Sequence, residues 1–138
     1  MISTRALVTR IEAALTAARS TATVSRILDF EAVLAADLRD APMLWVVLDS
    51  ETAAPNALDI GVSQQIEVQF STIYAAIDID ALDTLRALVR SALLGWAPLS
   101  DDGTATPFEH RSGEIADLAG DIIWWRENYA TTYIERAV

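Results

Sequence analysis

Two adjacent tryptophans, Trp124 and Trp125, constrain the fold of this chain most, because each indole ring needs a large area removed from water. They lie in a segment, residues 121–136, that is dense in β-branched and aromatic residues, which favour strands. The four-residue spacing of Trp125, Tyr129 and Tyr133 would also suit a helix. We predict a strand. No catalytic motif accompanies it, so we interpret the segment as architecture and contact surface.

The bulk composition describes a globular protein. A length of 138 residues predicts one domain over residues 1–138. The chain is 52% hydrophobic and 22% charged, which excludes a wholly disordered polypeptide. No apolar run reaches the roughly 20 residues that cross a bilayer, so we expect no membrane partner. The chain has no cysteine, which excludes disulfides and thiolate metal sites.

The charge distribution is strongly acidic, with a net charge of −10. All ten basic residues are arginines. Residues 1–30 hold four arginines against two acids, a surplus of +2, so the other six arginines and eighteen acids give −12. Such a surface repels the phosphate backbone, which argues against DNA binding through phosphates. It could keep the protein soluble, steer a basic partner, or line a channel through which DNA slides without sticking.

Three helices are expected. Ser3 or Thr4 can cap an amphipathic helix over about residues 5–18. A second is expected over residues 30–38. The clearest follows Asp80, which can cap it. Its apolar residues recur at three- and four-residue spacing. The sequence Gly95-Trp96-Ala97-Pro98 is predicted to end this helix. Arg86 and Arg90 lie four apart on the side that we predict to be exposed.

Several strands are expected before the third helix. Residues 24–28 suit a short strand, although Asp29 could instead cap a helix. The continuous apolar run 43–48 predicts a central strand buried on both faces, followed by a loop over residues 49–61. A long extended stretch covers residues 62–77, and its apolar alternation changes phase after Ser71. We favour a bulge or bend there. The alternative is that both faces of the sheet are covered at this end.

The region after the third helix predicts a hairpin. Asp101-Asp102-Gly103 is expected to form a turn. Residues 107–118 suit a hairpin strand, with Gly113 near a turn or bulge.

Candidate chemistry is sparse. Asp78, Asp80 and Asp83 supply carboxylates that a hard cation would accept, but they lack the glycine and distal glutamate of a calcium loop, so we interpret them as helix-capping acids. His110 follows Glu109, yet no nucleophile with an orienting partner is recognisable nearby, and a surface or edge-strand histidine is the better interpretation. We therefore expect no catalytic, metal or cofactor site.

The order of these segments resembles the tail terminator proteins of long-tailed bacteriophages and prophages. The similarity covers nearly the whole chain and is most specific over residues 62–129. It includes the strand Gly-Val-Ser-Gln-Gln-Ile-Glu-Val-Gln-Phe and a helix of the form Asp-x-Leu-x-x-Leu-Arg that ends in Leu-Leu-Gly-Trp-x-Pro. It ends with Pro-Phe-Glu-His-Arg-Ser-Gly-Glu-Ile followed by Ile-Trp-Trp-x-Glu-x-Tyr.

The resemblance implies an α+β fold with a mixed, mainly antiparallel sheet flanked by two to three helices in a single domain. It implies a non-catalytic role at the head-proximal end of the virion tail, assembled in the bacterial cytoplasm. There, a ring of six subunits would cap the tail tube protein, stop polymerisation and dock a head–tail connector protein. DNA would pass through its lumen unbound. The isolated protein could stay a monomer until it meets a tube.

Candidate subunit-interface residues follow from the exposed aromatic and basic groups: Trp124, Trp125, Tyr129, Arg86 and Arg90. Two other readings stay open. Another head–tail joining or tail-completion component would share a small fold and ring symmetry, and gene order would distinguish it. A small enzyme or ligand-binding domain would instead gather His110 and two carboxylates in a closed pocket.

Overall fold

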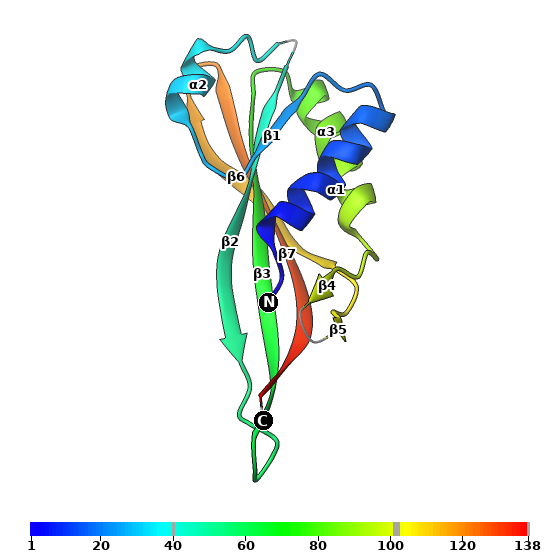
Figure 1. Cartoon of the computed structure of the whole chain (residues 1–138). Coiled ribbons are helices and arrows are strands. Elements are labelled where there is room, and N and C mark those ends of the chain that lie inside the picture. The colour runs from blue at the N-terminus through cyan, green and yellow to red at the C-terminus, as the bar shows by residue number, and fades with distance from the viewer. Residues whose placement is uncertain (40, 101–102, 138) are drawn as a thin grey trace.

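A computed structural model describes residues 1–39, 41–100 and 103–137. This part of the chain contains three helices and seven strands, whose arrangement is drawn in Figure 1. The helices are α1 (Thr4–Ala17), α2 (Phe30–Ala35) and α3 (Ile79–Leu93). The strands are β1 (Thr23–Ser25), β2 (Met43–Ala53), β3 (Val62–Ala76), β4 (Leu99–Ser100), β5 (Gly103–Thr104), β6 (Glu109–Ala119) and β7 (Ile122–Ala137). Asp101 and Asp102, most of the predicted turn, lie outside the described residues.

Five strands form one sheet in the order β1-β2-β3-β7-β6, and β4 pairs with β5 in a small ribbon. Strands β1 and β2 are parallel, whereas every other pair in the main sheet is antiparallel. The expected α+β fold is confirmed: a mixed, mainly antiparallel sheet with three helices in a single domain. The strand prediction for residues 121–136 is confirmed as well, since β7 is continuous and lies between β3 and β6.

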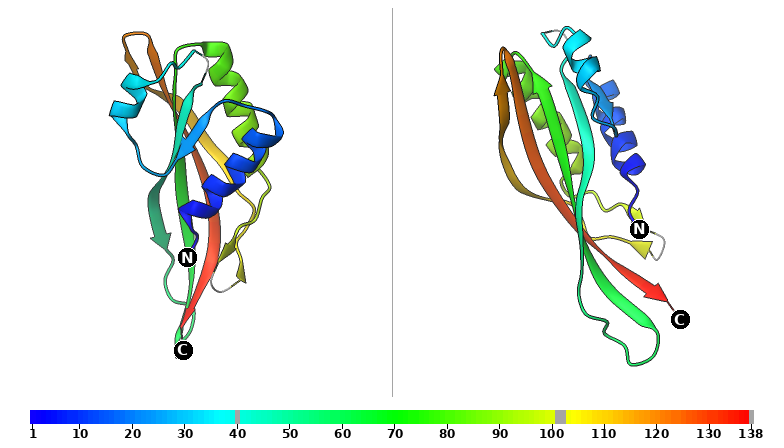
Figure 2. Two further views of the ribbon diagram at one scale, coloured as in Figure 1. Left: turned by 45° about the horizontal axis from the view of Figure 1, so that its top comes forward. Right: turned by 90° about the vertical axis from the view of Figure 1, so that its left-hand side faces the viewer.

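Helices α1 and α3 lie side by side over one face of the sheet (Figures 1 and 2). The side chain of Ser3 caps α1, as predicted, by accepting a hydrogen bond from the N–H of Arg5. The cap of α3 is Asp78 and not Asp80, so that prediction was wrong by two residues. Asp78 is extended, and its carboxylate accepts the N–H of Asp80 in the first turn.

The C-terminus of α3 matches the sequence pattern. Gly95 has a φ of +77°, a left-handed conformation that suits the position after the helix end. Its N–H bonds to the carbonyl of Phe108, and the indole of Trp96 stacks on the ring of Phe108 with centroids 5.8 Å apart. The chain after α3 is therefore tied to the segment that leads into β6.

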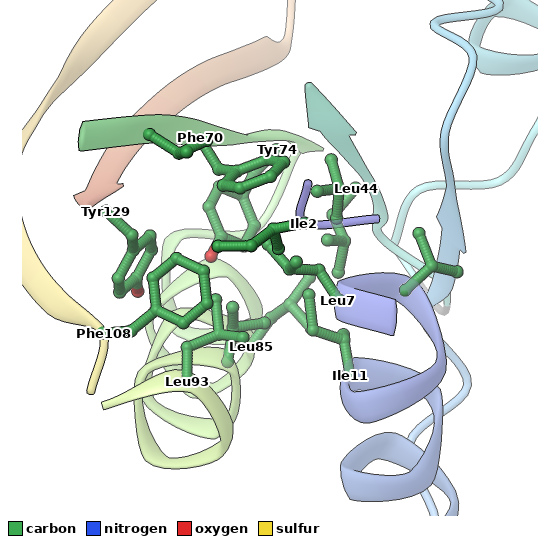
Figure 3. Close-up of a cluster of buried hydrophobic side chains, with 14 of the residues drawn as sticks. Ile2, Leu7, Ile11, Leu44, Phe70, Tyr74, Leu85, Leu93, Phe108 and Tyr129 are labelled. Atoms are coloured by element: carbon green, nitrogen blue, oxygen red, sulfur yellow. The ribbon is translucent and has the colours of Figure 1, made fainter. Parts of the chain in front are cut away.

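The main core fills the space between these helices and the sheet (Figure 3). Alternate residues of β3 point into it, from Ile66 to Ala76. They meet apolar side chains of α1 and α3, among them Leu7, Ile11 and Leu85, which are 2% exposed or less. Burial of this continuous apolar surface is the main source of stability.

A second, smaller core lies on the opposite face, beneath α2. It contains Val33, Leu38, Trp45 and Ala75. It explains the change of phase in residues 62–77, because α2 covers Ile73 and Ala75 while the main core covers their neighbours. The alternative of two covered faces is therefore correct, and the favoured bulge at Ser71 was wrong, since β3 pairs with β7 without interruption.

Strand β2 departs from the prediction at its second half. It continues through Ala53, so the first five residues of the predicted loop belong to the strand. The register shift in this ladder falls between Leu48 and Ser50, on β2. Strands β2 and β3 then extend as a hairpin away from the body of the molecule (Figures 1 and 2).

The sequence left open a short strand over residues 24–28 or a helix capped by Asp29, and the structure contains both a strand and a capped helix here. Residues 23–25 form β1, and Asp29 caps α2 by accepting the N–H of Ala32. Helix α2 is shorter than expected and ends at Ala35.

None of the helices in the described part of the chain is long and apolar enough to cross a membrane.

Candidate assembly surfaces

The two arginines of α3 converge on one buried carboxylate. Glu127 of β7 is completely buried, with its side chain pointing toward α3. The Arg86 Nη2 atom lies 2.7 Å from Glu127 Oε1, and the Arg90 Nη2 atom lies 2.9 Å from the same oxygen. The prediction that both arginines lie on the exposed side of the helix was wrong. Their side chains are only 21% and 38% exposed, because they neutralise Glu127.

Three further side chains complete this Glu127 cluster, which consists of Glu127, Arg86, Arg90, His110, Trp125 and Tyr129. The hydroxyl of Tyr129 donates to Glu127 Oε2 over 3.0 Å, and the Trp125 indole N–H donates to Oε1 over 3.3 Å. The Arg86 guanidinium also lies over the Trp125 ring, 4.2 Å from its centroid. His110 Nε2 lies 3.2 Å from Arg90 Nη2.

The pKa values in the cluster follow from this geometry. Burial acts to raise the pKa of Glu127, but hydrogen bonds from Arg90 and Arg86 outweigh it, so the pKa is below its ordinary value. Burial, and then the positive charge of Arg90, lowers the pKa of His110. Burial raises the pKa of Tyr129. The cluster therefore contains an ionised glutamate beside a neutral histidine at neutral pH.

The cluster also explains the glycine in β6. A Cβ atom at Gly113 would lie 3.3 Å from Glu127 Oε1 and 3.4 Å from the Trp125 ring. The predicted bulge near Gly113 is present as two register shifts, one on each side of it, between His110 and Ser112 and between Ile115 and Asp117. Strand β6 thus passes unusually close to the buried carboxylate.

His110 and the three acids Asp78, Asp80 and Asp83 belong to different elements of the fold. His110 is on the edge strand β6, as predicted, with its ring packed edge-on against Tyr129. Asp78 caps α3, and Asp83 pairs with Arg86 at 3.2 Å, which matches the interpretation of these acids as helix-end groups. In the described ranges, no group of three or more His, Asp or Glu side chains could hold a metal ion.

The helix-free half of the sheet is polar. We call it the open face; it holds Asp49 of β2, Glu67, Gln69 and Ser71 of β3, Glu109, Arg111 and Ser112 of β6, and Arg126 and Asn128 of β7. Arg126 forms an ion pair with Asp49, and Arg111 pairs with Glu109 at 2.7 Å and with Glu67 at 3.5 Å. These two arginines are therefore held by acids of the same face.

An apolar groove lies between α2 and the end of the β6–β7 hairpin. The α2 groove has a volume of about 500 Å³. Its lining is almost entirely apolar: Leu28, Phe30, Val33, Leu34, Ile73, Ala116, Asp117, Ala119, Ile122 and Trp124. Trp124, one of the predicted interface residues, lines the groove; its ring centroid lies 5.8 Å from that of Trp45, on which it stacks, and 5.5 Å from that of Phe30.

The sequence pattern missed both the groove and the buried carboxylate. Trp124 and Trp125 are both half-buried, but their side chains lie on opposite faces of the sheet. The alternation of side chains along a strand could have predicted this difference. Nothing in the spacing of residues identified Glu127, because its partners Arg86 and Arg90 come from a helix 37 to 41 residues earlier.

Comparisons with known proteins agree with this architecture. A family model described as phage tail terminator protein matches residues 1–137. A search of curated protein sequences finds no significant match. Among solved structures, a chain from the virion of a native gene transfer agent particle is similar, with a TM-score of 0.62 and 14% identity over 97% of this chain and 96% of that chain. At this identity the likeness shows the fold alone. The family model covers almost the whole chain, which therefore belongs to the phage tail terminator family, structural proteins of the virion tail.

Proposed function

We propose that this protein forms a closed ring, of six copies in the assembled tail, on the last ring of the tail tube. The ring stops the tube from growing and presents a docking surface to the head-side connector protein. Membership of the terminator family supports this role. No catalytic step is part of the proposal.

The observation that carries the proposal is the open face. It is a wide sheet surface without a covering helix, and its side chains are polar and bonded to one another. Ser71 donates to Asn128 over 2.6 Å, and Asn128 donates to Ser112 over 2.8 Å. Since Arg111 and Arg126 are paired with acids, this surface offers phosphates few unmatched cations. We place it toward the lumen, where DNA must slide without adhering.

A ring also needs a heterologous contact, in which two different surfaces of the subunit meet. Two features supply candidate surfaces. Strand β6 is an exposed edge strand, and no strand of the described residues pairs with its outer side. Large apolar side chains are exposed at the opposite ends of the molecule, including Leu34 of α2 and Ile60 in the connection between β2 and β3. Burial of these side chains in a contact between subunits would remove apolar surface from water and stabilise the ring.

The predicted interface residues differ in their suitability for a subunit contact. Trp124 lines the α2 groove, and it is the one that we retain for a direct contact. Trp125, Arg86 and Arg90 are only partly accessible, and Tyr129 is fully buried. For these four we propose a supporting role, in which the Glu127 cluster fixes β6 and β7 against α3.

Deletion of the gene from its phage or prophage tests the proposal. Electron microscopy should show overlong tails without heads, and expression of the chain in trans should restore a single tail length. Tails of normal length, joined to heads in the deletion strain, would refute the terminator role. A separate head–tail joining role would instead leave headless tails of normal length.

A further inference from the structure

Strand β6 divides into two halves that are held in different ways. The first half, residues 109–113, is tied by side chains to the rest of the fold. The contacts are His110 Nε2 to Arg90 Nη2 at 3.2 Å, Arg111 Nη2 to Glu67 Oε2 at 3.5 Å, and Asn128 Nδ2 to Ser112 Oγ at 2.8 Å. They join this half to α3, β3 and β7. We call it the anchored half.

The second half, residues 114–119, lacks such contacts, and we call it the flap. All six of its side chains are exposed, and none belongs to either core. Among the described residues, its side-chain hydrogen bonding is local, from the N–H of Leu118 to the carboxylate of Asp117, and no ion pair includes a flap residue. The flap is therefore held to the sheet by its backbone pairing with β7.

That pairing is itself interrupted. The register shift between Ile115 and Asp117 leaves Ala116 as an extra residue, and a bulge of this kind disrupts the ladder locally. Ile115 and Leu118 are 54% and 63% exposed, so closure of the flap buries little apolar surface. Backbone hydrogen bonds alone hold a short two-stranded ladder weakly, because ordering the chain costs conformational entropy.

The strand next to the flap is held independently of it. Ile122 to Trp125 of β7 are half-buried, and they pack against the two cores. On its other side, β7 pairs with β3 from Ile123 to Ala137. Opening of the flap therefore leaves β7 in place.

Two surfaces of the subunit depend on the position of the flap. Ala116, Asp117 and Ala119 line the α2 groove, and the turn after the flap lies at the same end of the molecule as α2 (Figures 1 and 2). An open flap removes this wall of the groove. It also frees the backbone groups of β7 that had been paired with it.

We propose that the flap opens and closes while the rest of the sheet stays folded. Gly113 and Gly120 lie at its two ends, where the backbone dihedrals must change, and glycine allows such changes without the steric limits of a Cβ atom. One local equilibrium thus controls both the α2 groove and the outer edge of β7. It is a property of the single subunit and is independent of the proposed ring.

Amide hydrogen exchange of the wild-type protein, resolved by NMR for each residue, tests the proposal. Flap amides that pair with β7 should exchange at least about tenfold faster than the paired amides of the anchored half. Both halves belong to one edge strand, so its place at the edge of the sheet affects them equally. Equal protection of the two halves would overturn the proposal.

A disulfide lock supplies a matched comparison, because the native chain has no cysteine. Leu118 and Ile123 are directly paired, at a Cα separation of about 4.5 to 5.5 Å that a disulfide can span. In oxidised Leu118→Cys/Ile123→Cys, flap exchange should slow to the rate of the anchored half, and reduction should restore the wild-type rate. The centre of β3 should be unaffected. Identical flap exchange in the oxidised and reduced proteins, with the bond confirmed by mass spectrometry, would contradict local opening.

The anchoring side chains give a second readout. Arg111→Ala/Ser112→Ala removes two of the three contacts that tie the anchored half to its neighbours. Exchange of residues 109–113 should then rise towards the rate of the flap, while exchange of β3 stays as in the wild type. An unchanged rate in residues 109–113 would contradict the division of β6 by its side-chain contacts.

Discussion

Arg86 Nη2 lies 2.7 Å from Glu127 Oε1, and the glutamate is inaccessible to solvent. This pair joins α3 to β7 across the main core. Arg90 approaches the same carboxylate, so two positive charges offset one buried negative charge. The stability of the sheet beneath α3 therefore depends on the electrostatic balance at Glu127.

Replacement of Glu127 by Gln should lower the free energy of unfolding by about 3 kcal/mol, because a buried ion pair loses one partner while the other stays in place. Urea unfolding measures this. The matched control is Glu114→Gln, an exposed acid of the same hairpin, which should change stability by about 0.5 kcal/mol or less. Equal effects of the two substitutions would refute a structural role of the cluster.

Stability should fall as the pH drops below about 6.5, the ordinary pKa of histidine. The folded-state pKa of His110 is lowered, so the unfolded chain binds the proton first and is favoured below that pH. The decline continues until the pH reaches the lower folded-state pKa. Thermal unfolding of the wild type and of His110→Gln across pH 5–8 would measure it. The variant should lack this step, and an identical profile would contradict the assignment.

Glu127 adds a second loss of stability at more acidic pH. Its folded-state pKa lies below the ordinary 4.5, so its contribution is present above that value and disappears as the pH falls through the folded-state pKa. In Glu127→Gln this acidic step should shrink while the step of His110 persists. Unfolding curves between pH 2 and 5 compare the two proteins.

The turn after α3 should be sensitive to backbone conformation alone. A Cβ at Gly95 would meet nothing within 4 Å, yet its φ is +77°. Gly95→Ala should therefore cost about 1 kcal/mol through strain, and Gly95→Asn should cost less because asparagine tolerates this conformation better. Chemical denaturation ranks the three proteins. A cost for Asn that exceeded the cost for Ala would contradict the explanation.

Removal of acids from the open face should make the ring adhere to DNA. Glu67→Gln/Glu109→Gln leaves Arg111 without its acidic partners. We expect this variant to retain duplex DNA at low salt, with retention lost as salt is added. Gel shift of purified protein measures this retention.

The control for that experiment is Glu12→Gln/Asp80→Asn, which changes the net charge equally at exposed positions of α1 and α3. It should behave like the wild type and retain no DNA. Equal retention by both variants would show that net charge alone matters and that the ion pairs of Arg111 do not.

Local patterns predicted most of the elements. The caps, the glycine stop of α3 and the dense β-branched run of β7 depend on neighbours in sequence, and Ser3, Gly95 and Trp124 lie where those patterns indicate. The cap of α3 was misplaced because Asp78 and Asp80 both precede the apolar pattern. Backbone geometry, which sequence does not display, selects Asp78.

Long-range features could not be predicted. The phase change at Ser71 has a tertiary cause, the packing of α2 over Ile73 and Ala75. Arg86 and Arg90 look like surface residues of an amphipathic helix until Glu127 is brought beneath them by the pairing of β3 with β7. The extension of β2 to Ala53 likewise depends on its partner strand, because residues 49–53 have little strand propensity.

Addition of the purified protein to growing tail tubes tests the central claim most directly. Tube protein polymerising from isolated tail tips should stop elongating once the protein is added, and the tube length in micrographs should depend on the time of addition. Continued elongation in the presence of excess wild-type protein would contradict the account.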